Sequence, residues 1–181
     1  MNVLALYSSP RRNSNSTFLL KEIMSAVKEK GVHTTTEFDV AKMNIKGCQA
    51  CEGCHNPKGN GGCVVKDDMQ QVLAAVKQAD YIFMSTPLYW WNISAQLKAV
   101  FDRFYSLNKK NDLQGKTIHL VITGASEEDD IGYELVNKTF MEICDYIGCE
   151  FKILIVSGDD SNPAQKNEKA IAQAKAIGES L

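Results

Sequence analysis

Short apolar or β-branched runs alternate with longer segments of helical periodicity along the whole chain, and this alternation constrains the fold more than any other feature. Each run has the length of a buried strand, and each is followed by apolar residues at helical spacing. We predict strands at 3–7, 34–40, 81–85, 117–123 and 151–157, and helices at 17–30, 69–78, 94–106, about 132–146 and 163–177. This alternation favours an open parallel sheet, because parallel neighbours need a crossover connection.

The predicted elements leave few topologies for the sheet, because the crossovers must be right-handed. A chain of 181 residues with no internal repeat or linker fits one domain, which we place at 1–181. The predicted fold class is α/β, a flavodoxin-like three-layer α/β/α sandwich. Its sheet has five parallel strands in the order 2-1-3-4-5.

The net charge of −2 excludes an electrostatic case for nucleic acid or for an anionic membrane surface. No segment reaches the roughly 20 apolar residues of a membrane span, and residues 1–7 are too short and lack the basic leader of a signal peptide. Six cysteines without an export signal indicate reduced thiols. We therefore expect a cytoplasmic protein with no nucleic-acid or membrane partner.

The loop after the first predicted strand, residues 8–17, is almost entirely polar and leads into a helix. Hydroxyl and amide side chains, two arginines and the free N–H groups of a helix start are the donors that a phosphate needs. Ligands of open parallel sheets bind beyond the strand ends, where the strand order reverses. Helix capping by Asn15, Ser16 or Thr17 is the alternative, but it explains only part of the polar run. The loop has no glycine and no Gly-x-Gly-x-x-Gly, so the Rossmann dinucleotide fingerprint is absent.

The loop after the third predicted strand places three aromatic residues, Tyr89, Trp90 and Trp91, in a row. Such side chains form a platform for a flat ring system, although they also suit a dimer interface. The small residues at 123–126 would let a ring approach the backbone closely. Together with the phosphate loop, these features predict a phosphorylated flat cofactor.

Three stretches of the sequence resemble the NAD(P)H-dependent FMN reductase group of flavodoxin-like proteins. The stretches are Ser9-Pro10-Arg11-x-x-Ser14-Asn15-Ser16, the Cys-x-x-Cys-x-x-Cys run with Cys63 to Met69, and Pro87-Leu88-Tyr89 to Lys98 with Asp102-Arg103. The resemblance covers roughly the first 105 residues.

This resemblance implies FMN as the cofactor and NAD(P)H as co-substrate. It implies a phosphate bound by Ser9, Arg11, Asn15, Ser16 and Thr17. It implies an isoalloxazine ring along Pro87, Leu88, Tyr89, Trp90, Trp91 and Asn92, with Thr123 and Gly124 at its other edge. It also implies a homodimer or homotetramer. Family members often have a hydroxyl residue or glycine where Trp90 and Trp91 stand, so the indoles are expected to restrict the acceptor pocket.

The cysteine-rich loop at 47–68 carries Cys48, Cys51, Cys54 and Cys63, a set that could hold an iron–sulfur cluster. It resembles the compact motif of iron–sulfur flavoproteins, which implies a [4Fe-4S] cluster, and we expect the loop to lie beside the flavin. Zinc, with His55 as a replacement ligand, and reduced thiols or a disulfide remain open.

The predicted function is an FMN-dependent oxidoreductase that takes hydride from NAD(P)H. It would pass electrons to a small acceptor, such as a quinone or a flavin, or to an iron–sulfur centre. The flavin carries this chemistry, so we assign no catalytic side chain. A non-enzymatic flavodoxin-like or iron–sulfur electron carrier is the alternative, and a thiol or metal sensor is a third.

Overall fold

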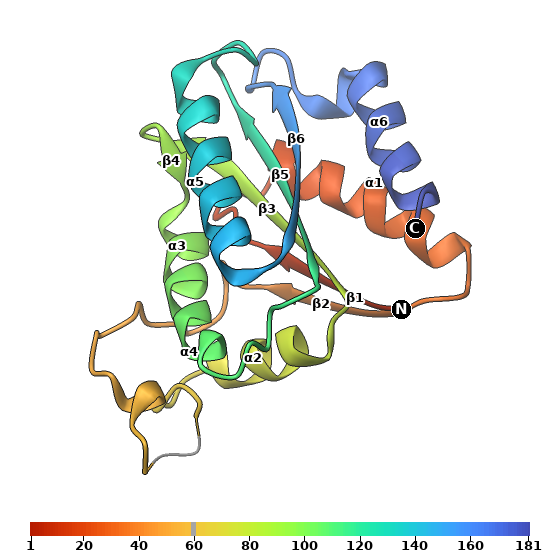
Figure 1. Ribbon diagram of the computed structural model, residues 1–181. Coiled ribbons are helices and arrows are strands. Elements are labelled where there is room, and N and C mark those ends of the chain that lie inside the picture. Colours follow the sequence, from red (N-terminus) through yellow and green to blue (C-terminus); the bar gives the residue numbers. More distant parts are fainter. Residues whose placement is uncertain (59–60) are drawn as a thin grey trace.

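The computed structural model describes residues 1–58 and 61–181 and shows one parallel sheet between two layers of helices (Figure 1). The parallel strands run in the order β2-β1-β3-β5-β6. Their bounds are β1 (Asn2–Tyr7), β2 (Thr34–Asp39), β3 (Tyr81–Tyr89), β5 (Thr117–Gly124) and β6 (Glu150–Ser157). These are the five predicted strands in the predicted order, so the flavodoxin-like fold class is confirmed.

The sheet has one more strand than predicted, because β4 (Asn92–Ile93) folds back on the end of β3. β4 pairs antiparallel with β3, with Leu88 opposite Ile93 and Tyr89 opposite Asn92. The prediction ended the third strand before Pro87, whereas β3 continues through this proline, which pairs with Thr123 of β5. A two-residue turn then reverses the chain.

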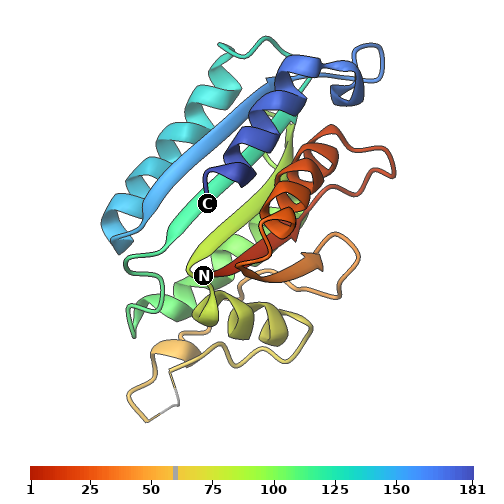
Figure 2. The ribbon, with the colours of Figure 1, turned by 90° about the vertical axis from the view of Figure 1, so that its right-hand side faces the viewer.

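Two helix layers cover the two faces of the sheet (Figure 2). On one side lie α1 (Asn15–Glu29) and α6 (Glu168–Glu179); on the other lie α2 (Met69–Gln78), α3 (Ala95–Phe101), α4 (Tyr105–Asn108) and α5 (Ile131–Ile147). The predicted helix at 94–106 is α3, a 3₁₀ turn (Asp102–Phe104) and α4 in succession. The other 3₁₀ turns in the described residues are Gly53–His55 and Ala164–Lys166.

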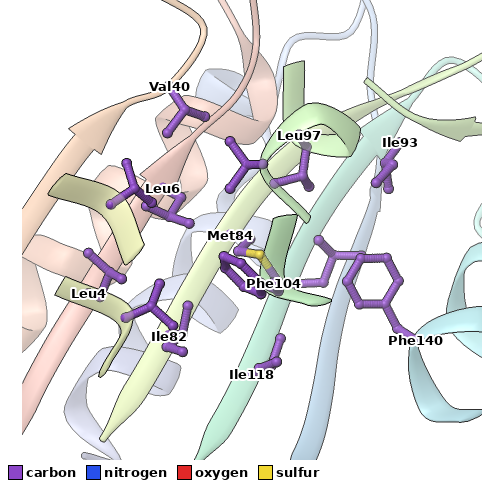
Figure 3. Packing of buried hydrophobic residues seen from close by; sticks show 14 of the residues in the cluster. Leu4, Leu6, Val40, Ile82, Met84, Ile93, Leu97, Phe104, Ile118 and Phe140 are labelled. Atoms are coloured by element: carbon purple, nitrogen blue, oxygen red, sulfur yellow. The ribbon is translucent and has the colours of Figure 1, made fainter. Parts of the chain in front are cut away.

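The larger core lies between the sheet and the α2–α5 layer (Figure 3). Leu4 and Leu6 of β1 and Ile82 and Met84 of β3 point to this side, because alternate residues of a strand face the same way. Val3, Ala5 and Tyr7 point to the opposite face and pack with α1 and α6. Burial on both faces explains why the central strands β1, β3 and β5 read as nearly continuous apolar runs.

Among the described residues, no helix has both the length and the apolar character needed to cross a membrane. Because the strands are parallel, the loops after β1, β3, β5 and β6 meet at one edge of the sheet. That edge carries the candidate site.

Candidate functional site

A cavity of about 460 Å³ opens at this edge, within the size range of cofactor pockets. Loops from four strands contribute to its wall. The lining residues are Ser9, Arg11, Asn13, Ser14, Asn15, Pro87, Leu88, Tyr89, Thr123, Gly124, Ala125, Gly158, Asp159, Asp160 and Ser161.

The polar end of the cavity is built around the start of α1. Ser14 is the N-cap, and its Oγ accepts a hydrogen bond from the Thr17 N–H at 3.2 Å. The first N–H groups of a helix have no partner within the helix, so those of Asn15 and Ser16 extend the set of donors at this end. Ser9, Arg11 and Asn15 line the cavity as expected, whereas the side chains of Ser16 and Thr17 are not among the lining residues.

The loop after β6, residues 158–161, forms the side of the cavity that the sequence analysis missed. Asp159 accepts hydrogen bonds from the Ser161 hydroxyl and amide and from the Asn162 amide, and these bonds lower the pKa of its carboxyl group. Asp160 forms an exposed ion pair with Arg11 at 3.2 Å. The rule that ligands bind beyond strand ends, applied to every strand, would have found this loop.

A buried network of hydroxyl groups fixes the loops to each other. Ser94 caps α3, and its Oγ lies 3.0 Å from Oγ of Ser8, which in turn donates to the carbonyl of Ser85 at 2.7 Å. The Ser94 N–H donates to Oγ1 of Thr86 at 2.9 Å. The ends of β1 and β3 and the start of α3 are therefore held together beneath the cavity.

Pro87, Leu88 and Tyr89 at the end of β3 and Thr123 and Gly124 at the end of β5 also line the cavity, and the two segments lie side by side because Pro87 pairs with Thr123. Gly124 is tightly enclosed, since a Cβ atom there would lie 2.8 Å from Oη of Tyr133 and 3.0 Å from Cβ of Leu88. Burial raises the pKa of Tyr133 to about 12, so its hydroxyl stays protonated at neutral pH. A larger residue at position 124 would therefore displace Tyr133 or Leu88, and Leu88 lines the cavity.

Trp90 and Trp91 form the tip of the β3–β4 hairpin, and both have positive φ, of 50° and 60°. A two-residue hairpin with positive φ at both positions is a type I′ turn, which normally carries Asn-Gly. Trp90 is 90% exposed and lines a neighbouring groove together with Asn92, while Trp91 lies against Gly132 at the start of α5. The aromatic run is therefore divided, with Tyr89 at the main cavity and the two tryptophans beyond its rim.

The four cysteines of the predicted metal site line a second cavity, of about 280 Å³. Cys48 and Cys51 are exposed, Cys63 is half-buried and Cys54 is buried, which raises the pKa of the Cys54 thiol. In the part of the chain that is described, no three His, Cys, Asp or Glu side chains are already arranged around one metal ion. Residues 59 and 60 of the cysteine-rich loop lie outside the described residues.

The four thiols line one cavity, and within the described residues they do not converge on one point. Four thiolates are the usual ligands of a [4Fe-4S] cluster. His55, the replacement ligand of the zinc alternative, is stacked on Tyr105 with ring centroids 4.3 Å apart, and it is not among the residues that line this cavity.

The cysteine-rich loop lies at the opposite end of the α3–α4 segment from the β3–β4 hairpin (Figure 1). The two cavities share no lining residue. The structure therefore places the cysteine-rich loop away from the 460 Å³ cavity within one chain, and the expectation that the loop lies beside the flavin stays a prediction. The position of the loop depends on contacts with the 3₁₀ turn after α3, which local sequence patterns do not reveal.

Comparison with known proteins gives the family. The model of the NADPH-dependent FMN reductase family matches residues 1–145. The chain belongs to this family. The match confirms the resemblance seen in the sequence.

Curated relatives include an iron-sulfur flavoprotein of Methanosarcina thermophila, 31% identical over 175 residues that make up 92% of this chain and 86% of that protein. An iron-sulfur flavoprotein of Methanocaldococcus jannaschii is 34% identical over 126 residues. That match spans 70% of this chain and 63% of the M. jannaschii protein, less than two thirds of its length.

Solved structures with the same fold include an NAD(P)H:quinone oxidoreductase from Methanothermobacter marburgensis. It superposes with a TM-score of 0.79 at 22% identity, and the match covers 100% of this chain and 96% of the oxidoreductase chain. An FMN-dependent NADH-azoreductase from Bacillus anthracis, solved in complex with FMN, has a TM-score of 0.73 at 16% identity and covers 100% and 99% of the two chains.

Proposed function

We propose that this protein oxidises NAD(P)H with FMN held in the 460 Å³ cavity and delivers the electrons to an acceptor. The observation that carries the proposal is that one cavity joins a set of anion-binding groups to a flat apolar shelf. The donors at one end include Ser9, Arg11 and Asn15, and the shelf at the other end is formed by residues 87–89. When bound, FMN would supply a ring that accepts hydride and releases electrons.

The residues of the chain would bind and orient this cofactor. The start of α1 and Arg11 face the phosphate end, where a helix N-terminus and a guanidinium both favour an anion. Arg11 is paired with Asp160 in an exposed contact of modest strength, so a phosphate could replace the carboxylate as its partner. Gly124 and the segment at 87–89 would fix the ring, leaving its outer face open for NAD(P)H.

We further propose that the cysteine-rich loop binds a [4Fe-4S] cluster through Cys48, Cys51, Cys54 and Cys63. Support comes from the cavity that these thiols share and from the similarity to proteins named iron-sulfur flavoproteins. The cluster would be one destination for electrons, and quinones, flavins and other small acceptors are the others. The separation of the two cavities along α3 favours transfer between subunits or to an external partner over transfer within one chain.

A homodimer or homotetramer and a cytoplasmic location belong to the same proposal. The exposed side chains of Trp90, Trp91, Ile131 and Leu135 give an apolar surface that a second copy could cover.

The test begins with protein purified without oxygen, followed by its absorption spectrum and its content of FMN, iron and sulfide. Steady-state oxidation of NADH and NADPH with several acceptors separates an enzyme from an electron carrier, which would show no turnover. Arg11→Gln should weaken FMN binding roughly 10- to 100-fold, since a hydrogen bond to a charged group contributes about 1.5–3 kcal/mol. The matched control is Arg12→Gln, because Arg12 is exposed and does not line the cavity. Equal effects of the two variants would contradict the assignment of the phosphate end.

A further inference from the structure

Arg103 lies in the 3₁₀ turn after α3, and its side chain is 0% exposed. Nη1 donates hydrogen bonds to both carboxylate oxygens of Asp67, at 2.7 and 2.6 Å, and to the carbonyl of Lys46 at 3.2 Å. Nη2 donates to the carbonyl of Val65 at 3.0 Å and to Sγ of Cys63 at 3.3 Å. One guanidinium therefore contacts the residue that precedes the cysteine-rich loop and three residues near the end of that loop.

Asp67 strengthens the same connection, because its buried side chain, 1% exposed, forms hydrogen bonds with both ends of the loop. Its carboxylate accepts the Lys46 N–H at 2.9 Å and the Met69 N–H at 3.1 Å. The Arg103–Asp67 pair thus closes the base of the loop and sets where Cys63 stands in the cysteine-lined cavity.

Stability alone does not explain this buried pair. Taking a guanidinium and a carboxylate out of water is unfavourable, and apolar side chains of similar volume often stabilise a fold equally well. Within the described residues, Nε of Arg103 has no hydrogen-bond partner. One of the hydrogen bonds of Nη2 goes to the sulfur of Cys63, and a thiol sulfur is a weak acceptor. An arginine adds N–H donors that an apolar side chain lacks: those to the carbonyls of Lys46 and Val65 hold the loop, and the one directed at Cys63 contacts a proposed ligand.

A metal-bound thiolate makes this hydrogen bond more favourable, because the sulfur then carries negative charge. Hydrogen bonds to the sulfurs of an iron–sulfur cluster are one of the factors that set its reduction potential. A donor that also carries positive charge favours the reduced, more negative state and so raises that potential.

We propose that Arg103 is a positioning residue of the iron–sulfur site: it fixes Cys63 as a ligand and donates a hydrogen bond to its sulfur that raises the reduction potential of the cluster. This inference rests on the proposed function, in which the cysteine-rich loop binds a [4Fe-4S] cluster.

The first test compares Arg103→Gln and Arg103→Lys with the unmodified protein, each loaded with iron and sulfide under anaerobic conditions. Lys109→Gln is the matched control, because Lys109 donates to the carbonyls of His55 and Asn56 in the same loop. Redox titration should give a lower midpoint potential in both Arg103 variants and an unchanged one in Lys109→Gln. Equal potentials in all the proteins would overturn the inference.

A second test needs no substitution and so does not depend on the variants folding. The chain has three arginines, Arg11, Arg12 and Arg103, and the first two lie in the loop before α1, remote from the cysteines. Protein labelled with ¹⁵N-arginine should show a ¹⁵N hyperfine coupling to the reduced cluster in pulsed EPR. Absence of this coupling would overturn the hydrogen bond to Cys63.

The two levels of the proposal fail in different ways. Iron and sulfide absent from the unmodified protein after reconstitution would refute the cluster itself, and the role of Arg103 with it. A cluster that forms but shows neither an arginine coupling nor a shifted potential would leave the proposed function intact and refute only the role of Arg103.

Discussion

Replacing Asp67 by asparagine should destabilise the fold strongly, because it leaves the guanidinium of Arg103 buried without its counter-ion. The two side chains are nearly isosteric, so no cavity forms and the effect is electrostatic. Removing one partner of a buried ion pair costs about 3–5 kcal/mol. For a chain of this size that corresponds to a fall in Tm of roughly 6–20 °C.

Urea unfolding at pH 7 with a fixed concentration of FMN measures the change in the free energy of unfolding. Glu134→Gln is the matched control, since Glu134 pairs with Lys138 on the exposed surface of α5 and should contribute less than about 1 kcal/mol. A loss below about 1 kcal/mol in Asp67→Asn, equal to that of the control, would refute the reasoning.

The pH dependence gives this prediction a second readout. Burial acts to raise the pKa of Asp67, but hydrogen bonds from Arg103 and from the amides of Lys46 and Met69 outweigh it and lower the pKa. The stabilisation that the charged carboxylate provides is therefore complete above the unfolded pKa of about 3.9 and is lost as the pH falls through the lower folded value. The difference between the wild type and Asp67→Asn should shrink below about pH 4. If this difference in the free energy of unfolding grew as the pH falls, the pKa of Asp67 would be raised in the folded protein and the reasoning would be wrong.

Three further predictions concern the cavity and the core. Gly124→Ala places a methyl group 2.8 Å from Oη of Tyr133, so FMN binding should weaken roughly tenfold, and adding Tyr133→Phe should restore part of it in a fluorescence titration. An unchanged affinity of Gly124→Ala for FMN would show that the close packing around Gly124 does not affect FMN binding. Asp160→Asn frees Arg11 from its exposed ion pair and removes a negative charge from the cavity. The same titration should then show FMN binding up to about fivefold more tightly. Weaker binding would argue against the proposal that the FMN phosphate replaces the Asp160 carboxylate as the partner of Arg11. Burial, with a contribution from the charge of Lys152, lowers the pKa of His119 to about 4, so the unfolded chain binds the extra proton between about pH 6.5 and 4. Wild-type stability should therefore fall by up to about 3 kcal/mol over that interval, and His119→Gln should flatten the dependence measured by urea unfolding at pH 7 and pH 4.5. An equal pH dependence in the two proteins would exclude His119 as its source.

The central strands β1, β3 and β5 could be predicted because burial on both faces makes them apolar runs, and the edge strand β2 because it is rich in β-branched residues. Their order could be predicted because right-handed crossovers leave few topologies for the sheet. The β3–β4 hairpin could not, because its turn residues, Trp90 and Trp91, adopt positive φ without the Asn or Gly that usually marks such a turn. Ser9, Arg11 and Asn15, which the resemblance assigns to the phosphate, line one cavity, and their role there stays a prediction.

The missed parts of the site depend on contacts between distant segments. The loop after β6 reads as an ordinary polar turn, and only the position of β6 in the sheet brings Asp160 to Arg11. The cysteine-rich loop is held by Arg103 and Asp67, which are 36 positions apart in the sequence. Helical periodicity gave no reason to expect an arginine of the α3–α4 segment to be buried.

The most direct test of the central claim is a fluorescence titration of the flavin-free protein with FMN and, separately, with riboflavin. The two flavins differ only in the phosphate that the start of α1 and Arg11 are proposed to bind. The account predicts that the fluorescence of both flavins is quenched on the same apolar shelf, which carries Tyr89, and that FMN binds at least roughly tenfold more tightly, the effect of one charge-assisted hydrogen bond. Equal affinities, or no quenching of FMN, would contradict it.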